Sequence, residues 1–334
     1  MPANRAFVLN SRPSRETPAG PHNFRYVESD IGEPGDGQVL VRHHYLSLDP
    51  YMRGRMNDAK SYAQPQPLGE VMVGGTVGEV VASRNPRFAV GDHVVGSGGW
   101  QLYSLSDGRG LRKIEGGTPM QAWLGPVGMP GVTAWYGVNK IIAPQAGETV
   151  VVSAATGAVG SVVGQLAKLA GAKAVGIAGG AAKCEFAVKE LGYDICVDHS
   201  DADFGDRLKA ALPDGINGIF ENVGGKPFEQ AMLWLNPFAR IALCGLVASG
   251  YDGTPTPLPD VRVLLNTRSR MEGFIVSDHM ALWPQALGEL AGHVAAGRIR
   301  WRETVAQGLE AAPQAFFAML KGGNFGKQLV KLVE

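Results

Sequence analysis

Residues 150–167 read Val-Val-Val-Ser-Ala-Ala-Thr-Gly-Ala-Val-Gly-Ser-Val-Val-Gly-Gln-Leu-Ala, and this stretch decides the fold. The three valines suit a buried parallel strand, and a helix pattern then continues to about Gly171. Residues 155–160 between them are a variant of the G-x-G-x-x-G turn with alanine in the first place. Gly157 lets the backbone approach a pyrophosphate, and Gly160 lets the helix pack closely on the strand. Because a helix N-terminus offers N–H groups to phosphates, the stretch predicts a dinucleotide-binding loop.

The same stretch allows two plainer interpretations. Small-residue turns occur in many α/β proteins, and residues 149–167 carry no charge and are long enough to span a bilayer. Three glycines, two threonines, two serines and a glutamine, with a change of period midway, argue against a membrane span. We therefore expect a strand, a turn and a helix.

Length and composition point to two domains and a small-molecule function. A chain of 334 residues is long enough for two hydrophobic cores. Lys+Arg and Asp+Glu both number 31, so no basic excess predicts a nucleic-acid partner. The N-terminus has no apolar signal core, and three cysteines make no paired framework. We expect a cytoplasmic protein that binds neither nucleic acid nor membrane.

The first part of the chain, to about residue 125, reads as short strands broken by glycine and proline. They fall at residues 5–9, 24–28, 38–45, 71–82 and 93–96. This spacing predicts a compact β-rich domain, like a barrel or a sandwich. Residues 46–56 and the polar segment after them read as loops, which makes Tyr51 and Tyr62 site candidates. Simple packing or surface roles for these tyrosines remain open.

Beyond a boundary at residues 125–137, strand and helix patterns alternate. Strands are expected at residues 174–178, 195–198, 216–223, 240–244 and 270–276, and helices at 183–191, 204–212, 228–235 and 281–296. The alternation predicts an α/β domain with a doubly wound parallel sheet. Residues 325–332 read as a last strand that can return to the first domain.

The second strand of this domain indicates the cofactor. An acidic residue at its end binds the ribose 2′-hydroxyl in NAD sites, but this strand ends in Ala178-Gly179-Gly180 with no acid. Lys183 follows where a cation can meet a 2′-phosphate. A merely solvated lysine is the alternative. The missing acid and the lysine together predict NADP(H).

The sequence favours hydride transfer without a metal. The β-rich half has no cysteine, and His43 and His44 are adjacent on a strand, so they point to opposite faces. No nucleophile elbow leads into a helix, and no helical H-E-x-x-H occurs. A metal-free enzyme polarises a carbonyl with donors such as a tyrosine or a ribose hydroxyl. We therefore expect no metal site.

Several motifs resemble the zinc-free medium-chain dehydrogenase/reductase family. They are residues 48–56, 128–134, 154–165, 220–225 and 322–327. Within the family the chain resembles the leukotriene B4 dehydrogenase / prostaglandin reductase group, and most closely its bacterial curcumin/dihydrocurcumin reductases. The resemblance implies a GroES-like domain from residues 1–125 and 310–334, a Rossmann domain from 126–309, and a homodimer. It also implies NADPH-dependent reduction of the carbon–carbon double bond of α,β-unsaturated ketones and aldehydes.

The resemblance also implies site residues. The cofactor would contact Met129, Thr133, Thr156, Gly157, Ala158, Val159, Gly160, Gly179, Lys183, His199, Asn222, Cys244, Gly245, Phe274, Ile275, Val276 and Asn324. Tyr51, Tyr62 and Tyr251 match tyrosines at the substrate site. One departure is that His199 stands where much of the family has a tyrosine close to the 2′-phosphate. The neighbouring Asp198 does not favour a phosphate, which weakens the expected preference for NADP(H).

Tyr251 is the first candidate for proton donor. It follows the fifth strand through a short link, near the carboxyl ends of the strands where ligands bind. Tyr51 and Tyr62, from the other domain, are then expected to orient the substrate. Two alternatives stay open: a quinone reductase on the same scaffold, and a nucleotide-binding protein without catalysis.

Overall fold

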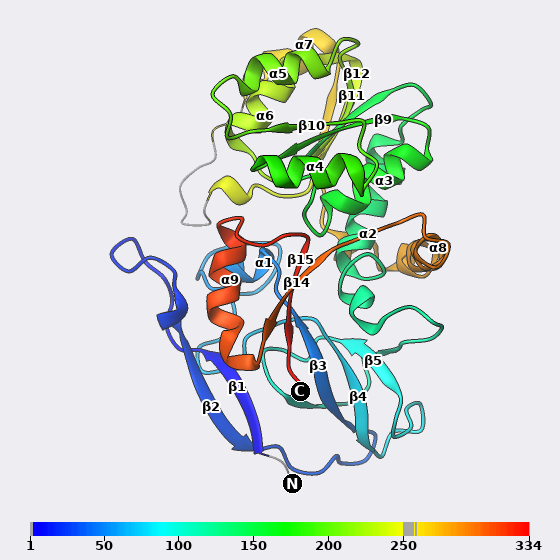
Figure 1. The fold of residues 1–334 in the computed structure, drawn as a ribbon. Helices are drawn as coiled ribbons and strands as arrows, with labels where there is room; N and C mark the ends of the chain where they lie inside the picture. The colour runs from blue at the N-terminus through cyan, green and yellow to red at the C-terminus, as the bar shows by residue number, and fades with distance from the viewer. Residues whose placement is uncertain (1–2, 250–256, 258, 334) are drawn as a thin grey trace. The chain divides into compact units, whose positions relative to one another are not determined.

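The computed structural model describes residues 3–249, 257 and 259–333, and the chain divides into two compact units (Figure 1). The first unit comprises Met1–Leu124, Glu303–Asn324 and Gln328–Glu334, and the second comprises Gly125–Arg302 and Phe325–Lys327. The chain therefore returns to the first unit at Glu303, several residues before the residue 310 expected from the sequence.

The second unit is built on a six-stranded parallel sheet. Its strands lie in the order β10 (Ile195–Asp198), β9 (Lys173–Ala178), β8 (Thr149–Ser153), β11 (Ile216–Glu221), β12 (Leu235–Leu243) and β13 (Arg270–Gly273). The chain thus winds outward in one direction from β8 and then in the other from β11. The carboxyl ends of β8 and β11 form the topological switch point where such sheets bind ligands.

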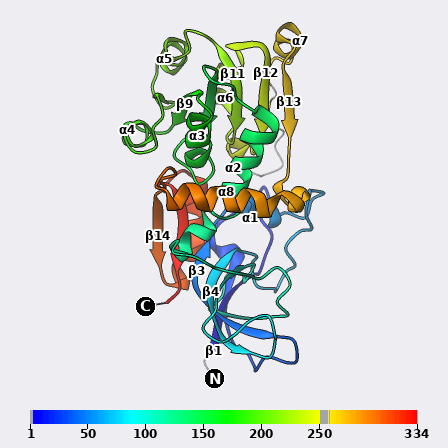
Figure 2. The same cartoon turned by 90° about the vertical axis from the view of Figure 1, so that its right-hand side faces the viewer.

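Helices cover both faces of this sheet (Figure 2). One face carries α2 (Met129–Tyr136), α3 (Gly160–Leu169), α4 (Ala181–Lys189) and α8 (Trp283–Ala295), and the other carries α5 (Phe204–Ala211), α6 (Gly225–Met232) and α7 (Arg262–Thr267). Val150 and Val152 pack into the first core, whereas Val151 packs into the second. Because successive strand residues point to opposite faces, one buried valine run serves both cores.

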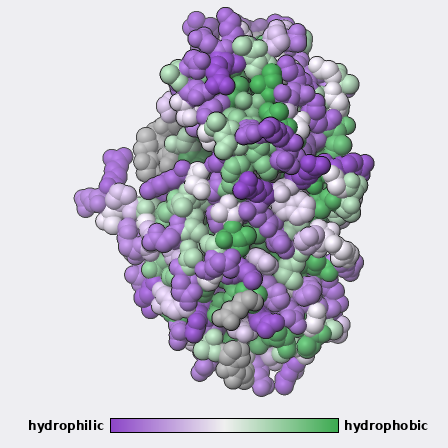
Figure 3. All heavy atoms as spheres, viewed as in Figure 1, coloured by the Kyte–Doolittle hydropathy of each residue, from purple (hydrophilic) through white to green (hydrophobic). Residues whose placement is uncertain are grey.

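Residues 149–167 accordingly form a strand, a turn and a helix, as expected. All five residues of β8 are buried. No helix within residues 3–249, 257 and 259–333 is long and apolar enough to cross a membrane. Figure 3 shows hydrophilic and hydrophobic residues interspersed on the face it displays, as the balanced composition suggests.

The first unit is rich in antiparallel strands. β1 (Ala3–Leu9) pairs with β2 (Phe24–Asp30). The larger sheet runs in the order β14 (Glu303–Gln307), β15 (Lys327–Lys331), β3 (Val39–Ser47), β4 (Thr76–Ser83), β5 (His93–Gly96) and β7 (Arg112–Lys113), with β6 (Tyr103–Ser106) also on β3. The expected return of the last strand is confirmed, since β15 pairs antiparallel with β3. Trp100, Phe316 of α9 (Ala312–Leu320) and Met52 lie in its main core.

Three sequence expectations were wrong in detail. Residues 51–55 form the short helix α1 (Tyr51–Arg55) rather than a loop, because Met52 and Met56 share the face that packs into the core. The helix expected at residues 228–235 is α6, which begins three residues earlier, and Leu235 already starts β12. The helix expected from residue 281 starts as a tighter turn, η5 (Val276–Leu282), before α8.

Candidate active site

The turn between β8 and α3 has the form of a phosphate-binding loop. Gly160 opens α3 so close to the turn that an added Cβ would lie 2.2 Å from the Ala154 carbonyl oxygen. No carbonyl or side chain of the described residues accepts the N–H groups of Ala158, Val159 and Gly160. Such N–H groups at a helix N-terminus are donors for anions. The turn therefore suits a pyrophosphate.

Thr156 and Gly157 shape the same turn. Gly157 closes it by donating its N–H to the Ala154 carbonyl at 2.9 Å, and Thr156 is buried. Ala154 has a φ of 48°, in the left-handed region, so the chain reverses sharply as it leaves the strand. The turn is thus held by its own backbone and by the packing of Thr156.

The expected 2′-phosphate residues gather where β9 leads into α4. Lys183 lies in the first turn of α4, and burial lowers the pKa of its ammonium group. An added Cβ at Gly179 would lie 3.0 Å from Nε2 of His199, so the imidazole lies against the end of β9. The Asp198 carboxylate accepts a hydrogen bond from the Gly180 N–H at 2.9 Å. Lys183 and His199 thus lie on the two segments that flank this strand end.

A second polar group lies at the switch point itself. Ser153 ends β8 and Glu221 ends β11, and the Ser153 hydroxyl donates to Oε1 of Glu221 at 2.9 Å. Asn222 donates its side-chain amide to the Ser153 carbonyl at 2.8 Å. The N–H groups of Cys244 and Gly245, after β12, donate to the Glu221 carbonyl at 2.9 and 3.1 Å. Three of the expected cofactor residues are therefore joined at one edge of the sheet.

The other expected residues of this unit are Met129, Thr133, Phe274, Ile275 and Val276. Thr133 donates its hydroxyl to the Met129 carbonyl at 2.8 Å within α2. Phe274 stacks on Tyr136 of α2, with ring centroids 5.3 Å apart, so α2 and the segment after β13 are packed together.

Tyr51, Tyr62 and Asn324 belong to the other unit. Tyr51 is half-buried on α1, and burial and then the nearby Asp49 carboxylate raise the pKa of its phenol. Tyr62 is 60% exposed, and Asn324 lies between α9 and β15. Tyr251 lies outside the described residues.

Metal-binding side chains do not cluster in the part of the chain that the structure describes: no group of three or more His, Cys, Asp and Glu residues is arranged to hold an ion. His43 is buried with Nε2 2.9 Å from the Ser104 hydroxyl. His44 instead lies 3.8 Å from the Glu79 carboxylate. The two adjacent histidines thus have separate partners.

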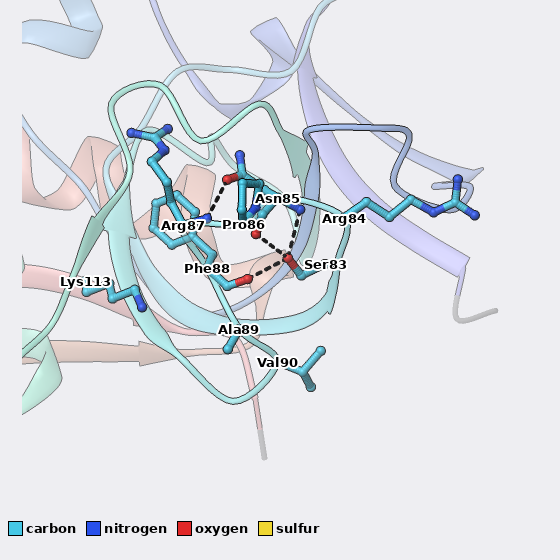
Figure 4. A pocket seen from close by; sticks show the side chains of 9 residues that line it. All are labelled: Ser83, Arg84, Asn85, Pro86, Arg87, Phe88, Ala89, Val90 and Lys113. Atoms are coloured by element: carbon cyan, nitrogen blue, oxygen red, sulfur yellow. Dashed lines mark hydrogen bonds between the residues drawn. The ribbon is translucent and has the colours of Figure 1, made fainter.

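A surface hollow of about 560 Å³ lies in the first unit, away from all the expected site residues in sequence (Figure 4). Its polar groups are used within the turn that lines it. The Ser83 hydroxyl donates to the Phe88 carbonyl at 2.6 Å, and Oδ1 of Asn85 accepts the Arg87 N–H at 3.0 Å. These two polar groups thus stabilise the turn that lines the hollow, and we do not assign the hollow to the candidate site.

Two family models match the chain: an N-terminal domain of oxidoreductases over residues 5–114, and a zinc-binding dehydrogenase domain over residues 158–292. With relatives 40% identical and more along almost its whole length, the chain belongs to the medium-chain dehydrogenase/reductase family. The predicted fold class, a GroES-like β-rich domain with a Rossmann domain, is confirmed.

Individual relatives show which members of the family the chain resembles. The chain is 48% identical to the NADPH-dependent curcumin reductase of Escherichia coli, over 98% of this chain and 97% of that one. It is 40% identical to prostaglandin reductase 1 of Rattus norvegicus, over 92% and 94% of the two chains. The structure of CurA from Vibrio vulnificus in complex with NADPH superposes with a TM-score of 0.92, at 47% identity and 99% coverage of both chains.

Ser153 and Glu221, which join the candidate site in the structure, were not predicted from the sequence. Both lie next to predicted residues, Ser153 before the glycine turn and Glu221 before Asn222. An acid at the end of the first strand beyond the switch point was the available signal, since ligands bind there.

Proposed function

We propose that this protein reduces the carbon–carbon double bond of α,β-unsaturated ketones and aldehydes with NADPH. One observation supports this proposal most directly: two features suited to a cofactor lie together at the switch point. They are the N–H groups of residues 158–160, which have no acceptor among the described residues, and the hydrogen bonds that join Ser153, Glu221 and Asn222. The curcumin and prostaglandin reductases named above support the substrate class.

The residues present fit this cofactor. The N–H groups of Ala158, Val159 and Gly160 would hold the pyrophosphate. Lys183 would meet the 2′-phosphate, with His199 as a second donor. The bound NADPH supplies the hydride. Asn222, Cys244 and the segment 274–276 would line the rest of the cofactor site, as would Met129, Thr133 and Asn324.

Hydride addition to the β-carbon of an enone leaves negative charge on the carbonyl oxygen, so a hydrogen-bond donor is required there. We assign this role first to Tyr251 and assign substrate orientation to Tyr51 and Tyr62. Burial keeps the Tyr51 phenol protonated, because its pKa is raised above the ordinary tyrosine value of about 10. Tyr51 can therefore donate a hydrogen bond at neutral pH.

A panel of enones, enals and quinones assayed with NADPH tests the proposal. We expect the highest kcat/KM with an enone or enal, with the double bond reduced in the product and the carbonyl retained. Faster turnover of quinones would favour the quinone reductase alternative, and no substrate-dependent NADPH oxidation would favour a binding protein. Turnover should survive prolonged chelation, and metal analysis of the purified protein should find no stoichiometric zinc.

We further propose a cytoplasmic homodimer. The three cysteines are free thiols, as in a reducing compartment. β13 pairs with β12 on one side only among the described strands, and an open sheet edge is a place for pairing with a second copy. Leu265 and Val261, just before β13, are 77% and 53% exposed and would be covered in such a pair.

A further inference from the structure

Glu221 is a buried acid that accepts three hydrogen bonds on one oxygen. Its side chain is 1% exposed, and Oε1 accepts from the Ser153 hydroxyl at 2.9 Å, the Val223 N–H at 2.6 Å and the Gly224 N–H at 2.7 Å. No cation pairs with it among the residues that the structure describes. A buried carboxylate without a cation is costly unless donors surround it, so these three bonds are what make it tolerable.

The bonds of Glu221 hold the turn that leads from β11 into α6. Gly224 and Gly225 have φ values of 78° and 60°, in the left-handed region, and Gly225 is the first residue of α6. The carboxylate accepts the N–H groups of the successive residues Val223 and Gly224. It therefore fixes the path from β11 into α6.

The residues that Glu221 contacts also join neighbouring segments. Ser153 accepts the Asn222 N–H on its hydroxyl at 2.8 Å and the Asn222 side-chain amide on its carbonyl at 2.8 Å. The Val223 carbonyl in turn accepts the Ala248 N–H at 2.9 Å, from the segment after β12. Hydrogen bonds of Glu221, Ser153 and Val223 thus link three loops at the carboxyl edge of the sheet.

We propose that Glu221 is the positioning residue for the nicotinamide half of the cofactor site. This inference rests on the proposed function. A doubly wound sheet is built from two mononucleotide-binding halves, and β11 begins the half beyond the switch point. Glu221 orients Asn222 through Ser153. Among the described residues no donor bonds to the Asn222 amide oxygen, so this oxygen can accept from a ligand. Lys183, on the other half, does not depend on Glu221.

Two variants and two ligands test this. Glu221→Gln keeps the size of the side chain but removes its charge, and Ser153→Ala removes the hydroxyl between Glu221 and Asn222. Dissociation constants are measured for NADPH and for adenosine 2′,5′-bisphosphate, which contains only the adenine half with its 2′-phosphate. We expect each variant to bind NADPH about fivefold more weakly and to bind adenosine 2′,5′-bisphosphate within about twofold of wild type.

Asn217→Ala is the matched control, because Oδ1 of Asn217 accepts the Thr149 N–H at 3.0 Å and joins the same two strands at their other end. It should lower the melting temperature and leave both dissociation constants unchanged. If both variants bind NADPH like wild type, or lose both ligands equally, Glu221 has no positioning role. A wild-type protein that binds neither ligand would instead overturn the proposed function. Should Glu221→Gln fail to fold, the two dissociation constants of Ser153→Ala still test the positioning role.

Discussion

Asp198 shows how a single charge beside the proposed 2′-phosphate site is accommodated. Its carboxylate accepts the Gly180 N–H at 2.9 Å, and the Ser200 N–H and hydroxyl at 2.9 and 2.6 Å. These bonds lower its pKa to about 2, so the group stays ionised at neutral pH. Its bonded oxygen accepts from backbone and serine donors, and Lys183 and His199 are the groups that we propose for the ligand.

Lys183→Ala should therefore change cofactor preference rather than cofactor binding in general. A charge-assisted contact to a phosphate is worth about 1.5–3 kcal/mol, so the NADPH dissociation constant should rise roughly tenfold to 150-fold. The NADH dissociation constant should stay nearly unchanged. Fluorescence titration with both cofactors measures this.

Lys189→Ala supplies the control on the same helix, since Lys189 forms an exposed ion pair with Glu185. It should alter neither dissociation constant. Equal losses for NADPH and NADH in Lys183→Ala would show that Lys183 does not bind the 2′-phosphate.

The tyrosines are distinguished by kinetics. Tyr251→Phe should lower kcat on the order of 10²-fold, because it removes a donor needed in the transition state. Tyr51→Phe should mainly raise KM, since Tyr51 is expected to orient the substrate. The raised pKa of Tyr51 predicts no loss of activity from its ionisation up to about pH 10. Steady-state kinetics of both variants across pH provide the measurement. Near-normal kcat in Tyr251→Phe would leave the ribose hydroxyl or water as the better donor.

At the scale of elements, local sequence patterns were enough to predict most of the helices and strands. The expected strand at residues 195–198 coincides with β10, because a short run with β-branched residues between polar residues favours a strand. The start of α6 could not be predicted, because it depends on Glu221 accepting N–H groups from a glycine turn. α1 was missed because its five residues are too short for a periodic signal and form a helix only against the core.

The glycine at the start of α3 gives an element-scale prediction. In Gly160→Ala the new Cβ would meet the Ala154 carbonyl oxygen at 2.2 Å and its carbon at 2.9 Å. Rigid backbone must move, so we expect a loss of about 1–3 kcal/mol of unfolding free energy and weaker NADPH binding. Chemical denaturation and cofactor titration measure the two effects.

Gly292→Ala is the matched substitution inside α8, where an added Cβ meets nothing within 4 Å. It should stabilise the protein by up to about 1 kcal/mol through helix propensity and leave cofactor binding alone. A Gly160→Ala protein as stable as wild type would show that the turn is not held as tightly as its geometry indicates.

At the scale of the whole molecule, the candidate site was predictable only in part. The predictions of the phosphate loop and of Lys183 rest on local spacing after a strand, which the sequence alone provides. The Ser153–Glu221 pair joins residues 68 positions apart, and only the strand order brings β8 and β11 side by side. The hydrogen bond from the Gly180 N–H to the Asp198 carboxylate likewise depends on the parallel pairing of β10 with β9.

Pairing of two copies gives the last prediction. A two-fold axis at β13 would extend the sheet and cover the apolar side chains of Val261 and Leu265. Wild type should therefore have the mass of a dimer in light scattering at micromolar concentration. The double variant Val261→Glu/Leu265→Glu places like charges against their symmetry mates, so its mass should fall toward that of one chain. Val90→Glu, at a residue that is 64% exposed in the other unit, should remain dimeric. A monomeric wild type contradicts the dimer, whereas a dimeric double variant contradicts only the choice of face.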